Sequence, residues 1–293
     1  MDKDYNIVDG SFYITHVCNL ACNHCESFNN FAWTNGHFKW ADYKADYKKW
    51  SEILYIDKIN IHGGEPITNP DIINWAKGIK KLWPNSKEYY VSCNGISLKN
   101  RVDLAKKLIK LGWSIDIVMH DPSHRQEVEH LIKTILEKHR YKIEKTDKKK
   151  NRYEYVVTKT GQLLISLEET YYFKENAISK IENGVVHLRR SDPVKAHTLC
   201  FEDLDDQCVG FFKGRMYKCP LTGMAEDLVN RFTIEEYAKD LLLSYKYGWP
   251  YDTKEELDSF FENLHKPLKQ CTLCADKKVL HPIFPMPTKK PKI

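Results

Sequence analysis

The sequence predicts an α/β protein in which a parallel sheet, open or curved into a partial barrel, carries helices on its outside. Between residues 11 and 143, short runs typical of strands alternate with segments whose apolar residues recur at helical spacing. This alternation is typical of parallel strands joined by crossover helices. In such sheets the binding residues follow the carboxyl ends of the strands. A cysteine-rich segment, Gly63-Gly64, Asn94-Gly95 and His120-Asp121 all fall at such ends.

The expected elements follow one another along the chain. The predicted strands occupy residues 11–17, 58–62, 89–93, 114–119 and 141–143. The predicted helices occupy residues 39–54, 71–82, 99–111 and 123–139. Breaker residues such as Asn69-Pro70 and Asn94-Gly95 separate them. Only five strands precede residue 145, so we expect a trimmed partial barrel.

The pattern changes after residue 145. Residues 153–158 and 163–167 form a predicted hairpin with its turn at Gly161. The remainder is expected to be rich in loops, with two helices that open at the capping-box sequences Thr233-x-x-Glu236 and Thr253-x-x-Glu256. We therefore expect three parts: a core domain over residues 1–150, a hairpin connection over 151–195, and a small domain over 196–293.

The composition excludes several classes of protein. The chain has 293 residues, of which 42% are apolar and 29% charged, as in a folded water-soluble protein. It has no run of eighteen apolar residues and no signal-peptide pattern, so we expect a cytoplasmic protein without a membrane partner. The net charge of +5 is mild, and the basic runs at residues 148–150 and 289–292 are typical of solvated surface. Nucleic-acid binding is therefore not indicated.

The nine cysteines are the most informative residues. An odd number of cysteines in a chain without an export signal favours metal binding or redox chemistry over disulfides. Cys18, Cys22 and Cys25 form Cys-x3-Cys-x2-Cys directly after the first predicted strand. Three thiolates can bind three irons of a [4Fe-4S] cube and leave the fourth iron open. A zinc site is the alternative, with His16 or His24 as its fourth ligand.

This segment resembles the Cys-x3-Cys-x-aromatic-Cys motif of the radical S-adenosylmethionine (SAM) superfamily, with a histidine at the aromatic position. A second segment is similar to the family's Gly-Gly-Glu-Pro motif after the second strand. The resemblance implies a [4Fe-4S] cluster on the three cysteines and SAM on the open iron. It also implies a set of SAM-binding residues: His24, Gly63, Gly64, Glu65, Pro66, Ser92 and Asn94.

A physical reason supports the glycine motif. Backbone that approaches the amino group of a ligand closely has no room for side chains, and Glu65 can offer a carboxylate to an ammonium group. The alternative is that Gly63 and Gly64 form an ordinary turn at the end of a buried strand.

The C-terminal cysteines carry a second resemblance. From residue 200 to residue 274 the chain contains Cys-x13-Gly-x4-Cys and then Cys-x2-Cys, which is similar to the opening of the SPASM pattern. The later cysteines of a full SPASM domain are absent, and the shortened form is the Twitch domain. The resemblance implies one auxiliary [4Fe-4S] cluster on four cysteines: Cys200, Cys219, Cys271 and Cys274. A four-cysteine zinc ribbon is the alternative, and Cys208 could replace Cys200 as a ligand.

The two resemblances imply an enzyme that reductively cleaves SAM to a 5'-deoxyadenosyl radical, which abstracts a hydrogen atom from its substrate. An auxiliary cluster can accept the electron of the substrate radical, so we expect a net oxidation and an oxidoreductase. The expected partners are a small-molecule or peptide substrate and an electron donor, either a reductase or a flavodoxin or ferredoxin. The alternatives are a peptide- or nucleotide-modifying radical SAM enzyme and, from a different class, a zinc-stabilised nucleic-acid-binding protein. The sequence identifies neither the substrate nor a catalytic side chain.

Overall fold

The structure is a computed structural model that describes residues 3–31, 36–147, 152–203 and 208–283, with the backbone alone at residues 147, 201–203 and 208. The basic runs at residues 148–150 and 289–292 lie outside the described residues. Within the described part, the largest sheet has nine strands in the order β12-β11-β1-β2-β3-β4-β7-β6-β5. None of the described helices combines the length and apolarity that crossing a membrane requires.

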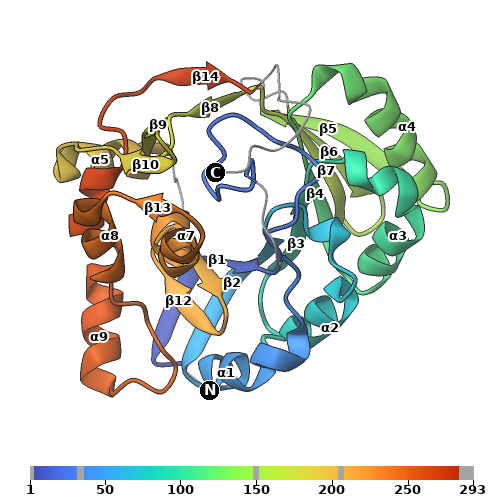
Figure 1. Cartoon of the computed structure of the whole chain (residues 1–293). Helices are drawn as coiled ribbons and strands as arrows, with labels where there is room; N and C mark the ends of the chain where they lie inside the picture. Colours follow the sequence, from blue (N-terminus) through green and yellow to red (C-terminus); the bar gives the residue numbers. More distant parts are fainter. Residues whose placement is uncertain (1–2, 32–35, 148–151, 204–207, 284–293) are drawn as a thin grey trace.

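The first half of the chain builds four parallel strands with a helix after each one. The strands are β1 (Tyr5–Tyr13), β2 (Leu54–His62), β3 (Glu88–Cys93) and β4 (Ser114–Met119). The helices are α1 (Trp40–Ile53), α2 (Ile72–Leu82), α3 (Val102–Lys110) and α4 (Arg125–Ile135). Figure 1 shows the four helices outside the curved sheet. The predicted parallel α/β partial barrel is thus confirmed.

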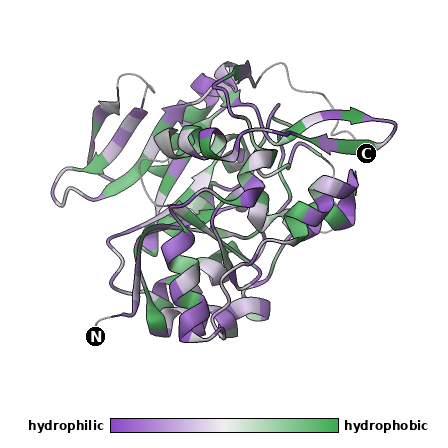
Figure 2. Cartoon of the chain, turned by 90° about the vertical axis from the view of Figure 1, so that its left-hand side faces the viewer, coloured by the Kyte–Doolittle hydropathy of each residue, from purple (hydrophilic) through white to green (hydrophobic). Residues whose placement is uncertain are grey.

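The core lies between these helices and one face of the sheet. A row of fully buried side chains crosses five neighbouring strands in register: Phe12, Ile61, Val91, Ile115 and Ile165. The helices cover this row with fully buried residues such as Trp50, Trp75, Leu108 and Ile132. Burying a side chain of this size contributes about 1.5–3 kcal/mol. Hydrophobic and hydrophilic residues alternate along the helices in Figure 2, as expected of helices with one buried side.

The last strands of the sheet lie in an order that the sequence pattern did not indicate. The strand predicted at residues 141–143 to continue the parallel series is β5 (Tyr141–Asp147), which lies at the edge of the sheet. It pairs antiparallel with β6 (Arg152–Val157), and β6 pairs antiparallel with β7 (Leu163–Glu169). Because two reversals restore the direction, β7 runs parallel to β4 and lies beside it. The predicted hairpin therefore belongs to the main sheet, which continues past residue 150.

The C-terminal half also contributes to this sheet, although sequence patterns indicated mainly loops there. Strand β11 (Cys208–Phe212) pairs in parallel with β1, and β12 (Arg215–Tyr217) folds back onto it. A helix not expected from the sequence, α5 (Pro193–Asp203), carries Cys200.

The remaining elements form small sheets and helices beside the main sheet (Figure 1). The strands are β8 (Tyr172–Lys174), β9 (Ile178–Glu182), β10 (Val185–Leu188), β13 (Thr233–Ile234) and β14 (Leu280–Pro282). The helices are α6 (Pro220–Gly223), α7 (Ala225–Arg231), α8 (Glu236–Leu243) and α9 (Lys254–Asn263).

Candidate functional site

The N-terminal cysteines lie on the loop that leaves the carboxyl end of β1. Cys22 is buried, and Cys18 and Cys25 are half-buried. The backbone N–H of Leu20 donates to the Cys18 sulfur at 3.5 Å, and the N–H of Cys25 donates to the Cys22 carbonyl at 3.3 Å. The loop thus folds back on itself at the edge of the sheet where parallel α/β proteins bind their ligands.

The Cys25 sulfur receives several hydrogen bonds from the backbone. Burial raises the pKa of the Cys25 thiol, and the N–H groups of Asn29, Ser27 and Asn30, which bond to the sulfur, oppose that rise. N–H groups stabilise the thiolate, the form of cysteine that binds iron. The environment of Cys25 therefore suits a metal ligand.

The glycines of the second motif pack directly against the cysteine loop. The N–H of Gly64 donates to the Thr15 carbonyl, and the N–H of Glu65 donates to the Val17 carbonyl, both at 2.7 Å. A Cβ atom on Gly63 would lie 2.7 Å from the Thr15 oxygen, and one on Gly64 would lie 2.5 Å from the Val17 oxygen. Side chains do not fit at these distances, so the close approach of two backbone segments explains both glycines.

The carboxylate of Glu65 points into the protein, where it joins the ends of β2 and β3. It accepts hydrogen bonds from the N–H groups of Asn94 at 2.8 Å and Ile67 at 3.2 Å. Burial raises its pKa to about 7, and these hydrogen bonds act against the rise. Pro66 follows at the start of a short 3-10 turn and is buried. Within the chain this carboxylate accepts from backbone N–H groups, and its predicted contact with the ammonium group of a ligand stays a prediction.

The two residues expected from the third strand occupy different places. The Asn94 side chain donates to the Asn19 side chain at 2.6 Å and so contacts the cysteine loop. Ser92 lies instead on the face of the sheet opposite the apolar core, where its hydroxyl is 3.3 Å from a carboxylate oxygen of Asp116. The structure therefore brings Asn94, but not Ser92, against the loop.

His24, at the aromatic position of the motif, stacks on a residue that sequence patterns did not indicate. Its ring lies 4.2 Å from the ring of His281 in β14, at an interplanar angle of 29°. His281 Nε2 in turn lies 3.0 Å from a Glu175 carboxylate oxygen. The C-terminal strand β14 thus lies against the cysteine loop.

A polar row crosses the face of the sheet opposite the apolar core. Ser92, Asp116, Ser166 and Glu154 are neighbours in register on β3, β4, β7 and β6. Asp116 accepts a hydrogen bond from Ser166, and the Arg152 guanidinium lies 3.5 Å from its carboxylate. Burial raises the pKa of Asp116, and the bond from Ser166 opposes the rise. This inner face offers hydrogen-bonding groups rather than apolar surface.

The four C-terminal cysteines of the expected auxiliary site lie on three segments. Cys200 lies on α5, Cys219 precedes α6, and Cys271 and Cys274 belong to a short 3-10 turn and its end. Burial raises the pKa of the Cys274 thiol well above its usual range, and Cys219, Cys271 and Cys200 add to the rise. Burial also raises the pKa of Cys200 to about 11, with Cys219 as its next cause. The thiols therefore lie within electrostatic reach of one another.

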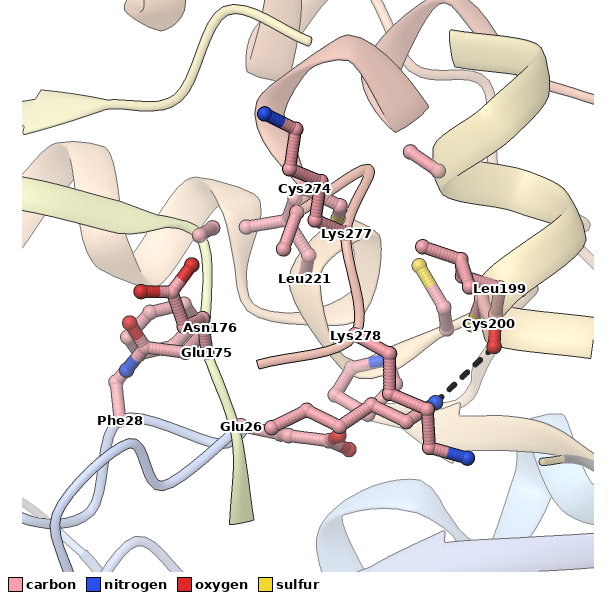
Figure 3. Close-up of a pocket in the computed structure, with 16 residues that line it drawn as sticks. Glu26, Phe28, Glu175, Asn176, Leu199, Cys200, Leu221, Cys274, Lys277 and Lys278 are labelled. Carbon is pink, nitrogen blue, oxygen red and sulfur yellow. Dashed lines mark hydrogen bonds between the residues drawn. The ribbon is translucent and has the colours of Figure 1, made fainter. Parts of the chain in front are cut away.

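A cavity of about 120 Å³ adjoins this group of thiols. Figure 3 shows Cys200 and Cys274 beside it, with Glu26 and Phe28 of the N-terminal loop at its other side. Lys174, also a lining residue, donates to the Leu199 carbonyl at 3.0 Å. Because Glu26 directly follows Cys25, the N-terminal cysteine loop contributes a wall to the cavity that the C-terminal cysteines also line.

Two further observations concern metal ligands. In the described part of the chain, no three His, Cys, Asp or Glu side chains meet closely enough to hold a single metal ion. The thiolates of a [4Fe-4S] cube each bind a different iron and are spaced around it. Cys208 opens β11 opposite Asp9, and its side chain lies outside the description, so the choice between Cys200 and Cys208 stays a prediction.

Comparison with known proteins gives one family and several solved structures. Among the structures, the chain is similar to BtrN in complex with AdoMet and 2-DOIA, with 20% identity over 40% of this chain and 47% of that chain and a TM-score of 0.32. It is similar to SuiB of Streptococcus suis bound to S-adenosylmethionine, with 17% identity over 44% of this chain and 38% of that chain and a TM-score of 0.28. It is similar to native anSMEcpe with bound AdoMet, with 13% identity over 80% and 65% and a TM-score of 0.37.

The chain thus spans less than half of BtrN and SuiB and 65% of anSMEcpe. No curated protein matched it. The family model for the radical SAM superfamily matches residues 12–154, the stretch that contains the cysteine loop and the Gly-Gly-Glu-Pro segment. Residues 12–154 of this chain are therefore a radical SAM domain.

Proposed function

We propose that this chain is an enzyme that binds a [4Fe-4S] cluster through Cys18, Cys22 and Cys25 and cleaves SAM. The observation that carries the proposal is the loop itself: three cysteines at the carboxyl edge of a parallel sheet, bonded through Thr15 and Val17 to the Gly-Gly-Glu segment. The residues fit the cluster, because the donor set is three thiols and backbone N–H groups bond to one of the sulfurs. A cube with three protein ligands has one iron free for the amino and carboxylate groups of SAM.

When bound, the reduced cluster supplies one electron that splits SAM into methionine and a 5'-deoxyadenosyl radical, which takes a hydrogen atom from the substrate. The chain's own residues position the reactants. Asn94 and Glu65 fix the ends of β2 and β3 against the cysteine loop, and the polar inner face contributes hydrogen-bonding groups to the substrate side. The required reductant is a reductase, a flavodoxin or a ferredoxin. The proposal places the enzyme in the cytoplasm, where thiols stay reduced.

A second [4Fe-4S] cluster is proposed for the C-terminal thiols of a Twitch-like unit. Its support is the mutual electrostatic reach of the thiols beside the 120 Å³ cavity: Cys200, Cys219, Cys271 and Cys274. A cluster held by these four thiols would supply an acceptor for the electron of the substrate radical, whose proton would leave to solvent, so that the substrate would be oxidised overall. The substrate is a small molecule or a peptide with polar groups that match the inner face.

The test of the first proposal is 5'-deoxyadenosine formation by anaerobically reconstituted, dithionite-reduced protein with SAM. We expect Cys18→Ala/Cys22→Ala/Cys25→Ala to abolish the product, because no other thiols lie on that loop. Cys93→Ala is the matched control: Cys93 is a buried cysteine of β3 outside both groups, and its removal should leave product formation intact. Unchanged product in the triple variant would refute the assignment.

The test of the second proposal is the iron that remains in the triple variant. Wild-type protein should hold about eight irons and the triple variant about four, the content of one cube. Zinc without iron in the triple variant would make the C-terminal unit a zinc module instead. Cys200→Ala should disturb the remaining paramagnetic signal and Cys208→Ala should not, whereas the reverse result would move the ligand to Cys208.

A further inference from the structure

A row of buried, hydrogen-bonded side chains leads from the C-terminal half of the chain to the N-terminal cysteine loop. Asp227 of α7 lies with Oδ2 at 2.8 Å from His16 Nε2. His16 Nδ1 lies 3.1 Å from the Tyr13 hydroxyl, and the Asn29 amide nitrogen lies 2.9 Å from the same hydroxyl. His16 and Asn29 are each 2% exposed and Tyr13 is 6% exposed. The row ends at the cysteine loop, because the backbone N–H of Asn29 donates to the Cys25 sulfur.

The direction of each hydrogen bond follows from the chemistry of the groups. Asp227 also lies 2.6 Å from the Lys213 ammonium, so its carboxylate is ionised and only accepts. His16 Nε2 must therefore carry a proton and donate to Asp227. In the neutral ring Nδ1 is then an acceptor, so the Tyr13 hydroxyl donates to it at 3.1 Å. The same hydroxyl accepts from the Asn29 Nδ2 group at 2.9 Å and shares its proton with Asn29 Oδ1 at 3.0 Å. The ionised carboxylate thus fixes the tautomer of His16 and, through it, the orientation of Tyr13 and Asn29.

The cysteine loop needs such an anchor. Phe28, directly before Asn29, has a φ of +56°, a conformation that is uncommon for a residue with a side chain. Strained backbone of this kind persists only where the surroundings fix it. Phe28 is 1% exposed, and its carbonyl accepts from the N–H of Phe31 at 3.2 Å. The buried Tyr13–Asn29 contact holds the residue that follows the strained position.

We propose that Asp227 is a positioning residue for the N-terminal cluster: through His16 and Tyr13 it fixes Asn29, whose N–H bond to Cys25 raises the reduction potential of that cluster. The inference rests on the proposed function and extends it, since it gives the C-terminal half of the chain a part in tuning the N-terminal cluster. A reduced cluster carries one more negative charge than the oxidised one, and an N–H group directed at a ligand sulfur stabilises that charge. Loss of the bond therefore makes reduction harder.

The test is a redox titration of reconstituted protein followed by electron paramagnetic resonance. Tyr13→Phe removes the central hydroxyl without a change of charge, and we expect the midpoint potential of the SAM-responsive cluster to become more negative. Tyr47→Phe is the matched control, because Tyr47 is also fully buried and its hydroxyl accepts one hydrogen bond, from the N–H of Gly214 at 3.2 Å, away from the row. It should leave the midpoint unchanged.

A second variant covers the case in which Tyr13→Phe does not retain its iron. Asp227→Ala/Lys213→Ala removes the outer end of the row together with its counter-charge, so that the net charge stays the same, and it should shift the midpoint in the same direction. A wild-type midpoint in an iron-loaded variant of either kind would overturn the inference. Wild-type protein without a SAM-responsive cluster would instead overturn the proposed function, so the two failures are distinguishable.

Discussion

Glu65 is fully buried between the ends of β2 and β3, where backbone N–H groups bond to its carboxylate. Its pKa of about 7 lies above the 4.5 of an ordinary glutamate because of burial. Between these two values the folded protein binds a proton that the unfolded chain has already released. The contribution of Glu65 to the unfolding free energy is therefore complete below pH 4.5 and is lost as the pH rises through 7.

Replacement of Glu65 by glutamine should remove this pH dependence. Between pH 5 and pH 8 the wild type should lose about 2.5 kcal/mol more of its unfolding free energy than Glu65→Gln, since one pKa unit corresponds to about 1.4 kcal/mol. Denaturant unfolding of both proteins at the two pH values measures the difference. Parallel pH profiles would show that Glu65 titrates normally in the folded protein.

Gly64 gives a second prediction at the scale of one residue. In Gly64→Ala the new Cβ would lie 2.5 Å from the Val17 oxygen, so the cysteine loop must move away. We expect a loss of stability of about 1–3 kcal/mol, as for other overpacked sites, together with a loss of iron from the N-terminal site. Gly210→Ala, whose Cβ would meet its nearest atom only at 4.0 Å, is the control for thermal unfolding and iron content. Equal behaviour of the two variants would contradict this explanation of the motif.

At the scale of elements, two identical capping-box patterns have different outcomes. The hydroxyl of Thr253 accepts from the Glu256 N–H at 3.3 Å and caps α9, as predicted. Thr233 caps nothing in the described structure, because it pairs with Val185 in β13 and α8 begins after Glu235. The four residues of a capping-box pattern do not reveal that the first of them pairs with a neighbouring strand.

The two threonines therefore make a matched pair. Thr253→Ala should lower the unfolding free energy by about 1 kcal/mol, the usual contribution of an N-cap side chain. Thr233→Ala, at an exposed position, should change it by much less. Equal losses in denaturant titrations would mean that the cap of α9 contributes nothing specific.

Because a sequence pattern is local, it predicted only the elements that do not depend on distant partners. The four helices between β1 and β7 have their own apolar periodicity, so residues 39–139 were placed with small errors at the ends. Strand β11 depends on a partner almost 200 residues away, and β7 takes its place beside β4 only because β5 and β6 reverse the chain twice. Such pairings are set by tertiary packing rather than by local pattern.

The candidate site shows the same difference between local patterns and long-range contacts. The cysteine loop and the Gly-Gly-Glu segment could be predicted because their residues are neighbours in sequence. The contacts of His24 with His281 and of His16 with Asp227 join segments more than 200 residues apart. Nothing in the local sequence of either partner indicates them.

At the scale of the whole molecule, both halves of the chain build the N-terminal site. β1 lies between β2 and β11, so the loop that leaves it extends over the place where the two halves meet. Phe28 and Phe31 of this loop pack in one apolar cluster with Phe212, Leu221 and Phe232 of the C-terminal half. The proposed catalytic loop therefore depends on the C-terminal half for its packing as well as for its hydrogen bonds.

The most direct test of radical SAM chemistry on this loop is the electron paramagnetic resonance spectrum of the reduced wild-type protein before and after addition of SAM. An iron without a protein ligand can bind SAM, and its binding changes the signal of that cluster. We predict that SAM changes one signal in the wild type and that this signal is missing from Cys18→Ala/Cys22→Ala/Cys25→Ala. A spectrum that SAM leaves unchanged, or a SAM-responsive signal that persists in the triple variant, would contradict the account.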